Sequence, residues 1–134
     1  MDFKDRVALV TGAGTGIGRS TAEAFARTGA KVVVNYSRSR EAAEDVVQHI
    51  RESGGSAVAV AADVGNDSQV RSMMDRVGQE FGRLDVLVNN AGWSTRIAHD
   101  KLEDLTDDIW DRTLNTNLRG VFYCVRAALP LLRN

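Results

Sequence analysis

Thr11-Gly12-Ala13-Gly14-Thr15-Gly16-Ile17-Gly18 follows a short apolar run, residues 7–10, and precedes a segment of helical pattern that extends to Thr28. Glycines at these positions allow positive φ and let a ligand come close to the backbone. A helix that begins at such a loop offers free N–H groups and the positive end of its dipole to an anion. The loop is therefore a candidate binding site for a diphosphate group.

The spacing of this loop, Thr-Gly-x-x-x-Gly-x-Gly, differs from the strict Gly-x-Gly-x-x-Gly of many dinucleotide sites. Residues 13–20 also come close to the phosphate-binding loop of nucleotide hydrolases, but Ala13 replaces its first glycine and Arg19 replaces its lysine. Asp63, which follows a later apolar run, could then hold magnesium. A P-loop-like nucleotide hydrolase and a plain strand-to-helix turn stay open as alternatives to a dinucleotide site.

Outward from the loop, apolar runs alternate with helical patterns. Strands are expected at residues 7–10, 31–36, 57–62 and 86–88, and helices at 20–28, 41–53, 67–81 and, with Thr106 as N-cap, from 107 to about Leu132 with or without a break. The strand runs are continuous rather than alternating, which is typical of parallel strands buried on both faces. Right-handed crossovers then predict an α/β fold, a Rossmann-type doubly wound parallel sheet that is truncated after about four strands.

Length and composition fit one globular domain. The chain has 134 residues, of which 43% are hydrophobic and 26% charged, and its net charge of −1 leaves no excess of cations for a nucleic acid. No stretch approaches the roughly 18 apolar residues of a membrane span, and the charged first residues are unlike a signal peptide. Because Cys124 is the only cysteine, no internal disulfide can form, and a reducing cytoplasm is the expected location.

Three further motifs follow the expected strands or lie in the last helical region. They are Asp63-Val64, Asn89-Asn90-Ala91-Gly92, and Asn117 within Asn115-Thr116-Asn117-Leu118-Arg119-Gly120. Together with the glycine loop, in this order and spacing, they resemble the short-chain dehydrogenase/reductase family, in particular its 3-oxoacyl-ACP reductase-like and glucose dehydrogenase-like members. The resemblance extends from Lys4 to Leu132.

The resemblance implies a role for each matched position. It implies that the pyrophosphate is wrapped by Gly12, Gly16 and Gly18, with the backbone of Ile17. Asp63 would bind the adenine amino group, and Val64 would add a backbone contact. Asn90, Ala91 and Gly92 would line the nicotinamide-side ribose and brace the sheet, and Asn117 would anchor a water in a proton relay. Structural roles stay open: Asp63 could cap a turn near Gly65, Asn89 and Asn90 could satisfy loop backbone, and Asn117 could be purely structural.

The residues after the second strand bear on the choice between NAD(H) and NADP(H). An acidic residue there would bind the ribose 2′-hydroxyl and repel a 2′-phosphate, which arginine can bind. Tyr36 stands where NAD-specific relatives typically carry aspartate, and Ser37 and Arg38 follow it. This favours NADP(H), with Arg38 as the ligand of the 2′-phosphate and Ser37 as a secondary donor, although NAD(H) stays possible. Arg38 and Arg40 could also be a solvated start to the next helix.

The family implies an oxidoreductase that reversibly reduces a small carbonyl substrate to an alcohol. Its proton donor is a tyrosine four residues before a lysine, assisted by a serine, but neither Tyr36 nor Tyr123 has such a lysine. We therefore expect residues 1–134 to be a dinucleotide-binding Rossmann domain that lacks the family's C-terminal portion and does not turn over alone. A non-catalytic dinucleotide-binding module completed by a partner chain is the alternative. The sequence does not indicate which carbonyl is the substrate.

Apolar surfaces predict self-association. The strand at residues 86–88 would be an exposed edge, and the last helix carries an apolar set comprising Val121, Phe122, Val125, Leu129 and Leu132. In the family that helix often packs against a second subunit, so a homo-oligomer is expected.

The remaining candidate residues receive mostly structural interpretations. Cys124 and Trp110 are expected in packing, and Trp93 in packing or in contact with substrate. His49 is expected in solvent, and His99 receives no role. The absence of a Cys/His cluster predicts no metal site.

Overall fold

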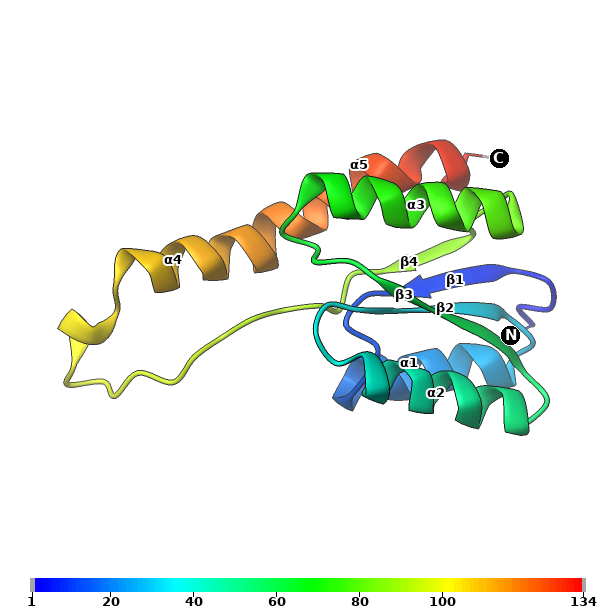
Figure 1. Ribbon diagram of the computed structural model, residues 1–134, viewed down its shortest axis with the longest axis horizontal. Coiled ribbons are helices and arrows are strands. Elements are labelled where there is room, and N and C mark those ends of the chain that lie inside the picture. The colour runs from blue at the N-terminus through cyan, green and yellow to red at the C-terminus, as the bar shows by residue number, and fades with distance from the viewer. Residues whose placement is uncertain (1, 134) are drawn as a thin grey trace.

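The computed structural model describes residues 2–133 and has three layers, with a parallel sheet between two pairs of helices (Figure 1). The strands are β1 (Val7–Val10), β2 (Lys31–Tyr36), β3 (Ser56–Ala61) and β4 (Val86–Val88), in the spatial order β3-β2-β1-β4. Helices α1 (Gly16–Arg27) and α2 (Arg40–Glu52) cover one face, and α3 (Asp67–Phe81) and α5 (Gly120–Leu132) cover the other. The expected Rossmann-type doubly wound sheet is confirmed.

The core consists of two apolar layers, one on each face of the sheet, because side chains alternate along each strand. Ala8, Val10, Val32 and Val34 belong to the layer under α1 and α2. Val7, Leu9 and Val33 belong to the opposite layer, which also contains Cys124 and Ala128 of α5. Cys124 is fully buried, as expected, and burial raises the pKa of its thiol to about 11.

The observed helix boundaries agree with the sequence-based predictions at some ends and differ at others. Helix α1 begins at Gly16, inside the glycine loop and four residues before the expected Ser20. Helix α3 matches its expected bounds and ends at Gly82, whose φ of +70° is the left-handed conformation typical of a glycine after a helix. Thr106 precedes α4 (Asp107–Leu114) at the N-cap position, but its side chain makes no capping hydrogen bond. Its carbonyl oxygen accepts from the N–H groups of Ile109 and Trp110 instead.

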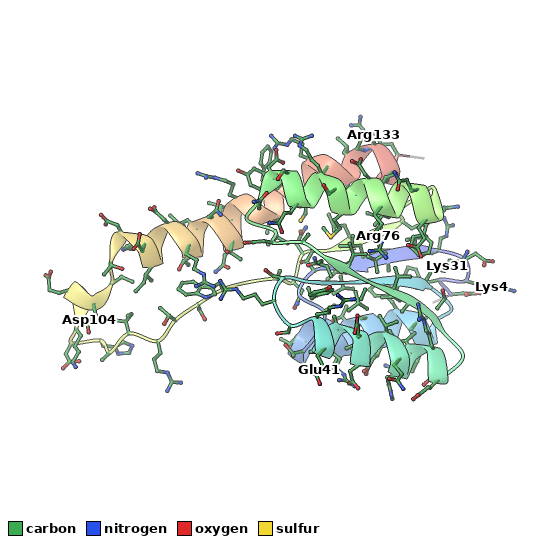
Figure 2. All side chains as sticks on the ribbon, viewed as in Figure 1. Lys4, Lys31, Glu41, Arg76, Asp104 and Arg133 are labelled. Atoms are coloured by element: carbon green, nitrogen blue, oxygen red, sulfur yellow. The ribbon has the colours of Figure 1, made fainter. Side chains whose placement is uncertain are left out.

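The helical region at the C-terminal end is interrupted. A five-residue π-helical turn, η2 (Asn115–Arg119), separates α4 from α5, so the region has the break that the sequence left open. Helix α4 and the segment before it, which includes the short 3-10 helix η1 (Leu102–Asp104), project away from the sheet at the carboxyl ends of the strands (Figure 1). Figure 2 shows Asp104 at the tip of this projection and Lys4 and Lys31 at the opposite end of the molecule. The expectation that Trp110 of α4 packs is wrong, because its side chain is 52% exposed.

Asp85, the residue directly before β4, is held in place by hydrogen bonds and ion pairs. Asp85 accepts hydrogen bonds from the N–H of Val7 at 2.9 Å and from the guanidinium groups of Arg6 and Arg83. Burial alone would raise the pKa of Asp85, but the hydrogen bonds from Arg83, Val7 and Arg6 outweigh it and lower the pKa to about 2. The carboxylate is therefore ionised at neutral pH and aligns the start of β4 with the start of β1.

Every helix between residues 2 and 133 is too short or too polar to span a bilayer.

Candidate functional site

A cleft of about 580 Å³ opens at the carboxyl ends of the strands, a common place for ligand binding in open α/β sheets. All eleven residues that the sequence assigned to a cofactor line it: Gly12, Gly16, Ile17, Gly18, Ser37, Arg38, Asp63, Val64, Asn90, Ala91 and Gly92. They come from the loops after all four strands, up to 80 positions apart in the chain. Asn117 is not part of the lining, although its neighbours Asn115 and Thr116 are.

The glycine loop contains two kinds of glycine. A Cβ on Gly18 would stand 2.4 Å from the carbonyl oxygen of Gly12 and 2.5 Å from Nδ2 of Asn90, and a Cβ on Gly12 would stand 2.9 Å from Cα of Ala91. These two glycines allow backbone segments to pack against each other. Gly16 has a φ of +56°, and no atom outside its neighbours lies within 4 Å of a Cβ added there. The backbone at Gly16 therefore faces open space in the cleft.

The start of α1 offers uncompensated N–H groups. The first N–H groups of a helix have no acceptor within the helix, and the side chain of Thr15, at the N-cap, does not supply one. The first turn contains no acidic residue, so the positive end of the dipole is not neutralised by the helix itself. This geometry suits an anion held by backbone N–H groups.

Thr11 and Asn90 fix the loop to the end of β4. Oγ1 of Thr11 accepts from the N–H groups of Asn90 and Ala91, at 3.0 and 2.9 Å. Nδ2 of Asn90 donates to the carbonyl oxygens of Thr11 and Gly12, at 2.9 and 3.1 Å. The side-chain amide of Asn90 thus satisfies loop backbone, the structural alternative left open by the sequence, while the residue still lines the cleft.

Asn35 is a site-supporting residue that the sequence analysis missed. Its side chain is buried at the end of β2, where Oδ1 accepts from the N–H of Gly12 at 3.1 Å. Nδ2 donates to the carbonyl oxygens of Val60 and Ala62, at 3.2 and 3.1 Å. One amide thus joins the glycine loop to the end of β3. The available signal was a single amide at the end of an otherwise apolar strand.

Asp63 performs the turn role that was left open. Its Oδ1 accepts from the N–H of Gly65 at 2.9 Å, and its carbonyl oxygen accepts from the N–H of Asn66 at 3.0 Å. The side chain is exposed at the cleft, and no hydrogen bond to its Oδ2 occurs within residues 2–133. One carboxylate oxygen can therefore still accept from a ligand.

The arginines near the end of β2 differ in their partners. Arg40 forms an ion pair with Glu44 at 2.8 Å. Arg19 bonds Asp45 at 2.8 Å and Glu23 at 2.9 Å, and these hydrogen bonds raise the pKa of its guanidinium group. Arg38 is exposed beside the cleft and forms no ion pair in the described part of the chain.

Asn117 lies in η2 and holds the residue after Gly92. Its Oδ1 accepts from the N–H of Trp93 at 2.7 Å, and its Nδ2 donates to the carbonyl oxygen of Trp93 at 2.9 Å. The Trp93 ring lines the cleft and packs under the guanidinium group of Arg112, 4.2 Å from its centroid. These two hydrogen bonds to Trp93 support a structural role for Asn117.

His49 and His99 are both exposed. Between residues 2 and 133 no three His, Cys, Asp or Glu side chains gather in a way that could hold a metal ion.

Comparison with known proteins gives a consistent result. Residues 6–134 match the family model for short chain dehydrogenase. A versicolorin reductase from Emericella nidulans is 46% identical over 128 residues, and a 3-oxoacyl-[acyl-carrier-protein] reductase from Synechocystis is 47% identical over 129 residues. These matches cover 96% and 95% of the chain but 47% and 50% of the relatives, so the chain spans about half the length of the curated relatives it matches.

Solved structures share the fold. The crystal structure of a short chain dehydrogenase from Burkholderia cenocepacia in complex with NADP superimposes with a TM-score of 0.90 and 42% sequence identity. The match covers 98% of this chain and 53% of that chain. A putative short-chain dehydrogenase/reductase from Burkholderia xenovorans gives a TM-score of 0.92 at 35% identity, covering 96% of this chain and 53% of that chain.

Proposed function

Because the chain belongs to the short chain dehydrogenase family, we propose that residues 1–134 form a dinucleotide-binding domain whose cleft holds a nicotinamide dinucleotide, preferably NADP(H). The observation that carries this proposal is the gathering of all eleven assigned residues around one cleft. The NADP complex of the Burkholderia cenocepacia relative supports it further. When bound, the dinucleotide would donate or accept the hydride.

The cleft offers a suitable group for each part of the dinucleotide. The free N–H groups at the start of α1 and the open space at Gly16 suit the pyrophosphate. The unbonded oxygen of Asp63 suits the adenine amino group. At the other end, Asn90 and Ala91 are bound by Oγ1 of Thr11, Asn117 holds Trp93 just after Gly92, and residues 90–92 suit the nicotinamide-side ribose. The proposed ligand therefore lies across the carboxyl ends of the strands.

Arg38 supports the preference for NADP(H). Arg19, Arg38 and Arg40 line a hollow next to this end of the cleft. Arg19 and Arg40 pair with carboxylates there, whereas Arg38, which also lines the cleft, forms no ion pair in the described part of the chain. Tyr36, half-buried at the cleft, replaces the carboxylate that would repel a 2′-phosphate. A phosphate beside Arg38 would gain charge-assisted hydrogen bonds, with Ser37 as a further donor.

Arg38→Ala is expected to weaken NADPH binding about 10- to 100-fold and to leave NADH binding unchanged. The loss corresponds to hydrogen bonds between a charged donor and a phosphate, about 1.5–3 kcal/mol in all. Calorimetric titration of the 134-residue chain with both dinucleotides measures it. Arg40→Ala is the matched control, because that guanidinium group is already bound to Glu44. Equal losses for NADPH and NADH would show that Arg38 does not read the 2′-phosphate.

For the whole protein we propose reversible reduction of a small carbonyl compound to an alcohol. The support is the family and the activity of its relatives from Emericella nidulans and Synechocystis, both named reductases. The 134-residue chain contains no tyrosine with a lysine four residues later, so we expect it to bind the dinucleotide without oxidising it. Substrate-dependent loss of NADPH absorbance at 340 nm by this chain alone would contradict that expectation. A binding module without chemistry would give the same negative result and is the alternative.

We also propose that the protein self-associates through α4 and α5. Leu114, Leu118, Phe122, Val125 and Leu129 recur at helical spacing and are all between 39% and 68% exposed. Such a stripe is typical of a helix that packs against a partner. A strictly monomeric sedimentation coefficient at high protein concentration would contradict this proposal.

The single, buried and unpaired Cys124 fits the proposed cytoplasmic location, which cell fractionation would check.

A further inference from the structure

The π-helical turn η2 contacts two loops of the cleft. From its first residue, Nδ2 of Asn115 donates to the carbonyl oxygen of Gly65 at 2.9 Å, in the loop after β3. Two residues later, Asn117 holds Trp93 after β4. These two loops lie at opposite ends of the proposed dinucleotide. Short π-helical turns are rare in proteins, but those that occur are often found at functional sites. Here the turn contacts loops at both ends of one cleft.

The contact between η2 and the loop after β3 is closely packed. A Cβ on Gly65 would stand 2.6 Å from Nδ2 of Asn115 and 3.3 Å from Oδ1 of Asp63. One turn further, a Cβ on Gly120 would stand 2.9 Å from Cγ2 and 3.0 Å from the carbonyl oxygen of Val64. Val64 and Gly65 are thus both in close contact with the segment from Asn115 to Gly120.

We propose that Asn115 is a positioning residue for the adenine end of the cleft. This inference rests on the proposed binding of a nicotinamide dinucleotide. Asp63 is exposed, and its carboxylate is oriented by the N–H of Gly65. The carbonyl oxygen of Gly65, in the next peptide group, accepts from Nδ2 of Asn115, which holds the backbone of Gly65 on its C-terminal side. Asn115 therefore acts on the ligand through the direction in which Asp63 points.

Asn115→Ala is expected to weaken binding of NADPH and of adenosine 2′,5′-bisphosphate by the same factor, about 3- to 10-fold. A net hydrogen bond of ordinary strength is lost, and the carbonyl group of Gly65 loses its side-chain donor, so the turn at Asp63 is held only by its own hydrogen bonds. The equal factor follows because the affected contacts all lie at the adenosine end. Arg119→Gln is the matched control on the same turn. Within residues 2–133 its guanidinium group makes one hydrogen bond, to Oδ1 of Asn115 at 3.4 Å, whereas the Gly65 carbonyl oxygen is bound by Nδ2. Its loss should therefore change either affinity less than twofold.

Gly65→Ala tests the same contact by changing the residue that Asn115 binds. The added Cβ would displace the Asn115 amide, so binding of the bisphosphate should fall by a similar factor. In the Asn115→Ala background the obstructing amide is absent, and Gly65→Ala should then cost less than it does alone. This non-additivity separates positioning by one contact from two independent losses of stability. All binding is measured in buffer where urea titration shows each variant fully folded.

The outcomes distinguish this inference from the proposed function. If the unmodified chain binds neither probe, the proposed function itself is wrong. If the unmodified chain binds both and Asn115→Ala binds both equally well, the positioning role is wrong. A loss for NADPH without a loss for the bisphosphate would place the effect away from adenosine and also overturn the inference. Strict additivity of the two substitutions would do the same.

Discussion

Replacing Gly18 with alanine is expected to lower the free energy of unfolding by about 2–3 kcal/mol and to weaken NADPH binding about 100-fold. The added Cβ would stand 2.4 Å from the carbonyl oxygen of Gly12 and 2.5 Å from Nδ2 of Asn90, so backbone has to move. Overpacking of this kind costs about 1–3 kcal/mol. The movement displaces the N–H groups that face the cleft, and two charge-assisted hydrogen bonds to phosphate account for the binding loss. Urea unfolding and calorimetric titration measure the two effects.

Two other glycines provide controls that separate backbone strain from ligand contact. Gly82 and Gly16 both have positive φ, +70° and +56°, and at both an added Cβ meets nothing within 4 Å. Alanine at either position should cost about 1 kcal/mol of stability through backbone strain alone. Gly82→Ala should leave binding unchanged, whereas Gly16→Ala should weaken it because its Cβ occupies the space proposed for the pyrophosphate. Equal binding by these two variants, or normal binding by Gly18→Ala, would contradict the proposed mode of binding.

The features that the sequence predicted are those that a local pattern determines. Apolar runs identified all four strands. The pattern is clearest in β1, which is buried throughout, and in Val32–Val34 of β2, because parallel strands covered by helices on both faces are mostly apolar. The glycine loop and the left-handed Gly82 follow from the conformational freedom of glycine. Asp63 and Asn90 could be assigned because they match motifs of the family that the chain resembles, and Arg38 because it follows the second strand; all three line one cleft.

The features that the sequence did not predict depend on partners far along the chain. Oγ1 of Thr11 pairs with residues 79 and 80 positions away, and Nδ2 of Asn115 with one 50 positions away. No local pattern shows such a partner. Thr106 has the right residue type for an N-cap, but its side chain makes no capping bond. Trp110 was expected to pack, but α4 projects from the sheet and leaves this residue half exposed (Figure 1).

Replacing Asn35 with leucine is expected to lower the free energy of unfolding by about 3–5 kcal/mol, the largest stability effect among these predictions. Leucine preserves most of the volume of a fully buried side chain but removes its polar atoms. The N–H of Gly12 loses its acceptor, and the carbonyl oxygens of Val60 and Ala62 lose a donor. Each buried group left without a partner costs about 1–3 kcal/mol. Because the net stability of a domain is about 5–15 kcal/mol, thermal and urea unfolding should both register the change clearly.

The same substitution at Asn89 is the appropriate control. Asn89 is exposed just after β4, and its side chain makes no hydrogen bond within residues 2–133, so Asn89→Leu should change stability by no more than about 0.5 kcal/mol. Any molecules of Asn35→Leu that stay folded should also bind NADPH weakly, because the glycine loop loses its link to the end of β3. If Asn35→Leu were as stable as Asn89→Leu, the buried amide would not be what joins these two segments. The order of the cleft would then have to come from packing of the glycine loop against Asn90 and Ala91 alone.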